Sequence, residues 1–91
     1  MVHDEKVGGY IHENQGEFVK EVVRLASQPS VSARKEGISE CAAIVKSMIE
    51  EVGGTTRLLE LPGAAPLVYG ELKSSKSPKT VLFYNHYDVQ P

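Results

Sequence analysis

The sequence predicts an α/β domain in which two N-terminal helices precede a three-stranded portion of a mixed sheet. Two segments in the first half repeat apolar residues at steps of three and four, the period of an amphipathic helix. After Gly54 the period changes, and three short segments rich in β-branched and aliphatic residues follow. The order of two helices and then three strands indicates helices layered on a sheet.

The first helix is predicted over residues 14–27. Phe18, Val22 and Leu25 fall at steps of four and three and make one apolar stripe. Pro29 ends the helix, because proline lacks an N–H and disfavours helical geometry at the residue before it.

The second helix is predicted over residues 33–52. Its continuous apolar face consists of Ile38, Ala42, Val45, Ile49 and Val52. Ser30 or Ser32 is expected to cap its start, and the glycine pair at 53–54 is a natural stop.

The three predicted strands cover residues 55–61, 67–72 and 80–84. Residues 80–84 form a nearly unbroken apolar run, which is typical of a central strand covered on both faces. A polar turn with a proline separates the second strand from the third. These two strands are therefore expected to form a hairpin.

Residues 1–13 are polar and contain two adjacent glycines, so we expect a flexible lead-in before a domain that spans residues 14–91. His3 and His12 lie in this lead-in and are interpreted as surface residues. The lead-in has no apolar stretch behind it, so we do not expect it to be a secretory signal.

Composition narrows the classes of function. Of the 91 residues, 41% are hydrophobic and 24% are charged, which is typical of a globular domain. The formal net charge is −2 and the basic residues are scattered, so a nucleic-acid partner is not expected. No apolar run reaches the roughly 18–20 residues of a membrane helix, and no membrane partner is expected. These features predict a cytoplasmic protein.

The single cysteine, Cys41, rules out a disulfide framework and a thiolate cluster for zinc. Cys41 is interpreted as a helix-packing residue, because no histidine is placed by the sequence to activate it. Glu50 and Glu51 are adjacent on the second helix, so their side chains diverge by about 100°. They are interpreted as a solvated face rather than as paired catalytic carboxylates.

The candidate chemistry lies at the end of the third predicted strand, at His86 and Asp88. Residues two apart in an extended chain point to the same side, with Cα atoms roughly 6–7 Å apart. A neutral imidazole is a good zinc ligand, and a nearby carboxylate can hold the other ring N–H and fix the tautomer. Tyr84 and Tyr87 flank the pair, either as lining of a pocket mouth or as core aromatics.

Residues 84–91, Tyr-Asn-His-Tyr-Asp-Val-Gln-Pro, resemble the first metal motif of the zinc-dependent aminoacylase/carboxypeptidase/dipeptidase superfamily, especially its dipeptidase-like branch. The predicted helices, the Pro-Ser-Val-Ser stretch at 29–32 and the predicted strands follow the order of that superfamily. The resemblance covers about residues 15–91. It implies that the sheet belongs to the catalytic domain of a zinc exopeptidase.

The resemblance implies that His86 ligates one of two zinc ions, with other divalent metals as possible substitutes. It also implies that Asp88 is a catalytic-site carboxylate that clamps the ring of His86. The bridging aspartate, the glutamate general base, the remaining ligands and a lid domain of the superfamily have no counterpart in this sequence. The chain is therefore expected to be the N-terminal fragment of a longer hydrolase, inactive alone and without bound zinc.

The implied activity is metal-assisted hydrolysis of peptide bonds in dipeptides or at C-terminal residues. A deacylase of N-acyl amino acids from the same superfamily is an alternative. A second alternative is a small non-enzymatic α/β interaction module. The implied partners are a peptide substrate and a second copy in a homodimer, and the isolated chain is also expected to self-associate through its open strand edge.

Overall fold

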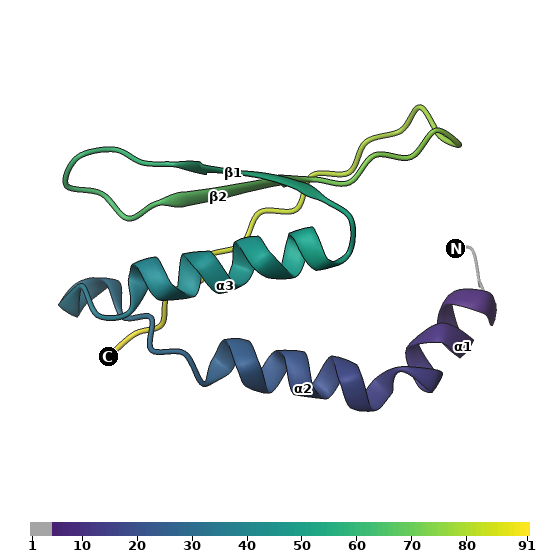
Figure 1. Cartoon of the computed structure of the whole chain (residues 1–91), viewed down its shortest axis with the longest axis horizontal. Coiled ribbons are helices and arrows are strands. Elements are labelled where there is room, and N and C mark those ends of the chain that lie inside the picture. The colour runs from purple at the N-terminus through teal and green to yellow at the C-terminus, as the bar shows by residue number, and fades with distance from the viewer. Residues whose placement is uncertain (1–4) are drawn as a thin grey trace.

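The computed structural model describes residues 5–91 and has an α/β architecture. The elements in chain order are α1 (Glu5–Glu13), α2 (Gln15–Ala26), a 3-10 turn (Ser32–Arg34), α3 (Ile38–Glu51), β1 (Thr55–Leu59) and β2 (Leu67–Glu71). Figure 1 shows α3 lying between the β1–β2 hairpin and α2. Within residues 5–91, no helix is long and apolar enough to cross a membrane.

The predicted first helix is confirmed as α2, within one residue at each end. Its N-terminal neighbour α1 lies in the segment that the sequence predicts to be a flexible lead-in. The apolar residues Val7, Tyr10 and Ile11 repeat at helical spacing, and the rings of Tyr10 and Phe18 lie 5.9 Å apart between centroids. Residues 5–13 are therefore helical, although none of them is buried.

The predicted second helix is confirmed in its body and at its end but not at its start. It begins at Ile38, five residues later than expected, because Lys35 and Gly37 have positive φ values of 52° and 70°. Val31 and Glu36 bridge through two backbone hydrogen bonds of 2.8 and 3.1 Å, which close the intervening residues into a tight loop. Gly37, and not Ser30 or Ser32, stands at the N-cap position.

Gly37 also allows a close approach of two backbone segments. A Cβ atom at this position would lie 1.9 Å from the carbonyl oxygen of Pro29. The left-handed φ and the missing side chain are both required there, so the loop of residues 29–37 depends on this glycine.

The first two predicted strands are confirmed as β1 and β2, which pair antiparallel with Leu59 opposite Leu67. One face of this hairpin packs on α3 so closely that a Cβ at Gly70 would lie 2.7 Å from Cδ1 of Ile49. The buried apolar residues within 5–91 are Cys41 and Ala42 of α3, each 1% exposed.

The predicted third strand and the predicted hairpin between residues 67–72 and 80–84 are wrong. Residues 80–84 have no regular secondary structure, and the sheet of the described chain has two strands. A strand needs a hydrogen-bonding neighbour as well as a suitable composition, and no segment within residues 5–91 pairs with this one. In Figure 1 the segment returns past the hairpin towards α3.

The apolar run of residues 81–84 is highly exposed. The exposed fractions are 72% for Val81, 86% for Leu82, 82% for Phe83 and 86% for Tyr84. A contiguous exposed apolar row is a site for association with another surface. We call residues 81–84 the apolar row.

We predict that the 91-residue chain self-associates through the apolar row. Sedimentation equilibrium should give an average mass above 9.9 kDa that rises with concentration. Leu82→Lys should raise the dissociation constant at least about tenfold, because it places a charge in the apolar contact. Leu61→Lys, at a leucine 72% exposed in the hairpin loop, is the matched control and should not. A clean monomer at all concentrations would contradict the prediction.

We also predict that Gly37→Ala destabilises the fold by more than about 1–3 kcal/mol, the usual cost of a strained backbone, because the clash with Pro29 adds to the left-handed strain. Gly16→Ala is the control. It lies in α2, where the added Cβ meets no atom within 4 Å beyond its chain neighbours and the backbone of its own helix, and it should stabilise by about 0.5–1 kcal/mol. Urea denaturation of the three proteins measures both effects, and equal stabilities would refute the role of Gly37.

Candidate functional site

The candidate site is a short segment without regular secondary structure, residues 86–89, held against the body of the fold. The amide of Val89 donates a 2.7 Å hydrogen bond to the carbonyl of Ser30. The carbonyl of Tyr87 accepts a 3.7 Å contact from the thiol of Cys41 on α3. The backbone of the segment is therefore fixed by the loop before α3 and by α3 itself.

A third attachment comes from the hairpin loop. The hydroxyl of Tyr87 donates a hydrogen bond to the carbonyl of Pro66. Burial raises the pKa of Tyr87 above its ordinary value of 10.0, with smaller contributions from Cys41 and Asp88. Tyr87 is half-buried, whereas Tyr84 is exposed in the apolar row, so the two tyrosines have different environments.

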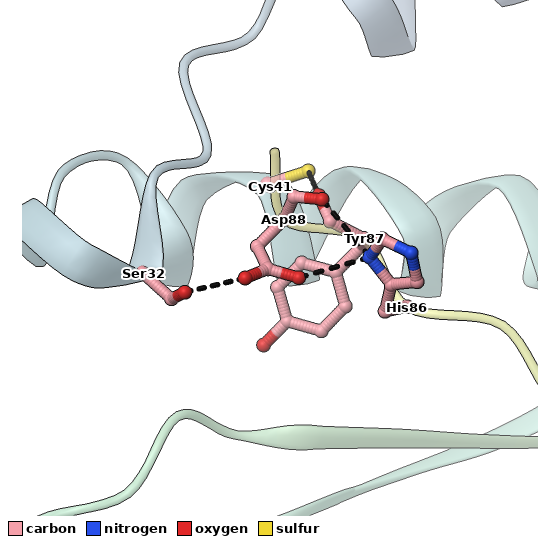
Figure 2. A network of polar contacts seen from close by, with 5 residues as sticks. All are labelled: Ser32, Cys41, His86, Tyr87 and Asp88. Atoms are coloured by element: carbon pink, nitrogen blue, oxygen red, sulfur yellow. Dashed lines mark hydrogen bonds and ion pairs between the residues drawn. The ribbon is translucent and has the colours of Figure 1, made fainter. Parts of the chain in front are cut away.

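His86 and Asp88 are in direct contact, as their spacing predicted. The Nδ1 atom of His86 lies 3.0 Å from Oδ1 of Asp88 and 3.0 Å from the carbonyl oxygen of Asp88. Both partners are acceptors when the carboxylate is ionised, so Nδ1 carries the proton and donates. In a neutral ring this tautomer leaves the lone pair on Nε2, which Figure 2 shows directed away from the network.

The second carboxylate oxygen of Asp88 has its own partner. The hydroxyl of Ser32 donates to Oδ2 (Figure 2). This hydrogen bond, followed by the one from His86, holds the pKa of Asp88 below its ordinary value. Asp88 is therefore ionised at neutral pH and acts as an acceptor on both oxygens. The side chain of His86 is 79% exposed and that of Asp88 is 35% exposed, so the ring is open to a ligand.

His86 and Asp88 together supply one oriented metal ligand, which is fewer than a complete metal site needs. An open catalytic zinc site uses about three protein ligands. Within residues 5–91, no cluster of three or more His, Cys, Asp or Glu side chains could hold a metal ion. The described chain therefore offers one imidazole with an orienting carboxylate.

The other candidates singled out in the sequence behave as expected. Cys41 is buried and forms no disulfide. Glu50 contacts Lys46 at 2.9 Å and Thr56 at 2.6 Å, whereas Glu51 pairs with Arg24 on α2 at 3.0 Å. The two carboxylates thus diverge to separate partners.

His12 lies exposed on α1. His3 is outside the described residues, so its prediction as a surface residue is untested.

An open groove of about 450 Å³ adjoins the pair through Ser32. The loop residues Lys35 and Gly37, the first turn of α3 and residues 63–66 of the hairpin loop also line it. Ser32 thus lines the groove and also donates a hydrogen bond to Asp88, the residue that contacts the ring of His86.

Sequence reasoning missed the contact of Ser32 with Asp88. The two residues are 56 positions apart, so no local spacing indicates their contact. Ser32 was expected to compete with Ser30 for the helix cap, but no side-chain hydrogen bond caps α3. The only sequence signal was the resemblance of the Pro-Ser-Val-Ser stretch to the superfamily.

A curated protein from Schizosaccharomyces pombe (strain 972 / ATCC 24843), Cys-Gly metallodipeptidase dug1, is similar to this chain. The identity is 32% over 99 residues, covering 96% of the chain and 21% of the relative. The chain thus spans about a fifth of the relative's length. No family model and no solved structure matches the chain. The similarity supports a relationship to metallopeptidases.

We predict that the stability supplied by Tyr87 is lost at high pH. Because its pKa in the fold is raised above the unfolded value of 10.0, the contribution is complete below pH 10.0 and disappears as pH rises through the folded pKa. A phenolate also cannot donate to Pro66. In an alkaline absorbance titration, Tyr87→Phe should remove a tyrosinate step that lies above pH 10.0, and the control Tyr84→Phe should leave that step in place. Persistence of that step in Tyr87→Phe would refute the assignment.

Proposed function

We propose that this chain supplies a metal-ligating histidine, His86, and its orienting aspartate, Asp88, to a metallopeptidase that hydrolyses the peptide bonds of dipeptides or of C-terminal residues. The observation that carries the proposal is the geometry at Nδ1 of His86. Two acceptors of Asp88 hold the proton there, which leaves Nε2 free to bind a metal.

The proposed metal centre holds two zinc ions, or other divalent ions, and takes its remaining ligands from residues outside this chain. A bound metal of this kind polarises a carbonyl group and lowers the pKa of a bound water. In this chain, the task of His86 is to present Nε2. The task of Asp88 is to keep the proton on Nδ1 and to offset the positive charge that the ring acquires from the metal.

Two further observations support the proposal. The ring of His86 is 79% exposed, so a metal could approach it without rearrangement of the fold. The relative is named a Cys-Gly metallodipeptidase, which agrees with a small peptide as the substrate. A deacylase of N-acyl amino acids would use the same two residues and differ in substrate. We further propose that the complete enzyme is a cytoplasmic homodimer and that this chain alone is inactive and holds no zinc tightly.

A non-enzymatic interaction module is the second candidate. The observation in its favour is the apolar row, which offers a contiguous exposed surface to a partner. It gives no account of the contact between His86 and Asp88, because a docking surface formed by residues 81–84 does not require an ordered imidazole two residues further on.

The test starts with the protein in its source cells, captured by an antibody against residues 14–53. We expect a species several times heavier than 9.9 kDa that hydrolyses dipeptides, including Cys-Gly, and loses activity to a metal chelator. His86→Ala in that species should lower kcat/KM at least about 100-fold, because it removes a metal ligand. His12→Ala, at an exposed histidine on α1, is the control and should leave activity unchanged.

The outcomes separate the candidates. Preference for N-acyl amino acids over dipeptides would select the deacylase. A species of 9.9 kDa with no hydrolytic activity would favour the interaction module. A heavier species that is fully active as His86→Ala would overturn the role proposed for His86.

A further inference from the structure

We infer that Ser32 is a positioning residue for the candidate metal ligand: its hydroxyl fixes the carboxylate of Asp88, which in turn fixes the tautomer and orientation of the His86 ring. The inference rests on the proposed function for its significance. Its evidence is the Ser32–Asp88–His86 chain of hydrogen bonds.

The direction of each hydrogen bond follows from the chemistry of its groups. An ionised carboxylate only accepts, so the Ser32 hydroxyl donates to Oδ2 and the ring N–H of His86 donates to Oδ1. The two oxygens of Asp88 are thereby divided between two donors. One donor comes from the loop before α3 and the other is the ring to be oriented.

The carbonyl oxygen of Asp88 also lies 3.0 Å from Nδ1 of His86 and does not depend on Ser32, so Ser32 acts only on the share of the ring's orientation that the carboxylate supplies. The second contact on the carboxylate strengthens that share. The terminal torsion of aspartate has a broad energy minimum, so one hydrogen bond does not fix the plane of the group. Asp88 lies in a segment without regular secondary structure, and its side chain is 35% exposed. A donor on the opposite oxygen restricts the rotation and keeps Oδ1 directed at Nδ1.

Ser32 is itself held in place. It begins the 3-10 turn, and its carbonyl accepts a 3.1 Å hydrogen bond from the amide of Lys35. The bridge between Val31 and Glu36 closes the loop around this turn. The carbonyl of Ser30, two residues earlier, receives the amide of Val89 at 2.7 Å. The same loop therefore holds both the backbone and the carboxylate of the site.

The role of Ser32 as a helix cap does not compete with this one. The 3-10 turn and α3 both lack a side-chain capping hydrogen bond. The hydroxyl of Ser32 is therefore directed to Asp88, 56 positions away.

The test reads the tautomer of His86 in the metal-free 91-residue chain. Long-range ¹H–¹⁵N correlation spectra of the histidine rings, recorded where the rings are neutral, give the ratio of Nδ1–H to Nε2–H forms. The exposed ring of His12 supplies the reference ratio in the same sample. We expect His86 to favour the Nδ1–H form strongly relative to His12 in the unsubstituted protein.

Ser32→Val and Ser32→Thr form the matched pair, because the two side chains have nearly the same shape and only threonine has a hydroxyl. Ser32→Val should shift the ratio at His86 about fivefold towards that of His12, the effect of one hydrogen bond. Ser32→Thr should retain the ratio. Ser39→Ala, at another serine lining the groove, should leave it unchanged. Backbone amide spectra verify the fold of each variant, and Ser32→Ala replaces Ser32→Val if valine disrupts the loop.

An unchanged ratio in a folded Ser32→Val or Ser32→Ala protein would overturn the inference. So would loss of the ratio in Ser39→Ala to the same extent. The outcome is independent of the hydrolase assay. A tautomer shift in a protein whose longer form cleaves no peptide would leave Ser32 as the holder of the His86 ring and would overturn the proposed function alone.

Discussion

The hydrogen bond from the Val89 amide to the Ser30 carbonyl ties the candidate site to the body of the fold. The site segment has no secondary structure of its own, so its position is set by hydrogen bonds to other parts of the fold. The loop between α2 and α3 supplies one with the carbonyl of Ser30 and supplies a side-chain donor with Ser32. The conformation of this loop depends in turn on the left-handed Gly37 and its contact with Pro29. A backbone constraint far from the histidine in sequence thus determines where the histidine lies.

The rest of the domain acts as the support for that loop. The α3 helix packs on the hairpin through the contact of Ile49 with Gly70 and buries Cys41. Cys41 then contacts the carbonyl of Tyr87, and the hairpin loop receives the hydroxyl of the same residue at Pro66. The site therefore lies where the loop, the helix and the hairpin meet. By contrast, α1 contributes no residue to these contacts, and α2 is linked to α3 by an exposed ion pair worth about 0–1 kcal/mol.

The parts that could be predicted from the sequence are those set by local periodicity. The stripe of Phe18, Val22 and Leu25 located α2, and the β-branched segments located β1 and β2. The contact of His86 with Asp88 was also predictable, because two residues two apart meet through short-range geometry.

The start of α3 was not predictable from the sequence, since the positive φ at Lys35 is a property of the closed loop. The prediction of the third strand was wrong for a related reason. Composition indicates a preference for a sheet, but a strand forms only where another strand is available to pair with it. The contact of Ser32 with Asp88 is long-range and had no spacing signal.

Two features of the described residues, an exposed apolar row and a single candidate metal ligand, are adjacent in the chain. The apolar row at residues 81–84 is exposed on all four side chains, and His86 follows it with one imidazole where a zinc site needs about three ligands. Under the proposed function, one additional segment would cover the apolar row and also supply the missing metal ligands. A segment packed beside the row would bring its own side chains close to the ring of His86. The same surface would then be unavailable to a second copy. Self-association of the isolated chain and completion of the metal centre are therefore competing uses of one surface, and the cover that a longer protein places on the apolar row would determine which of them occurs.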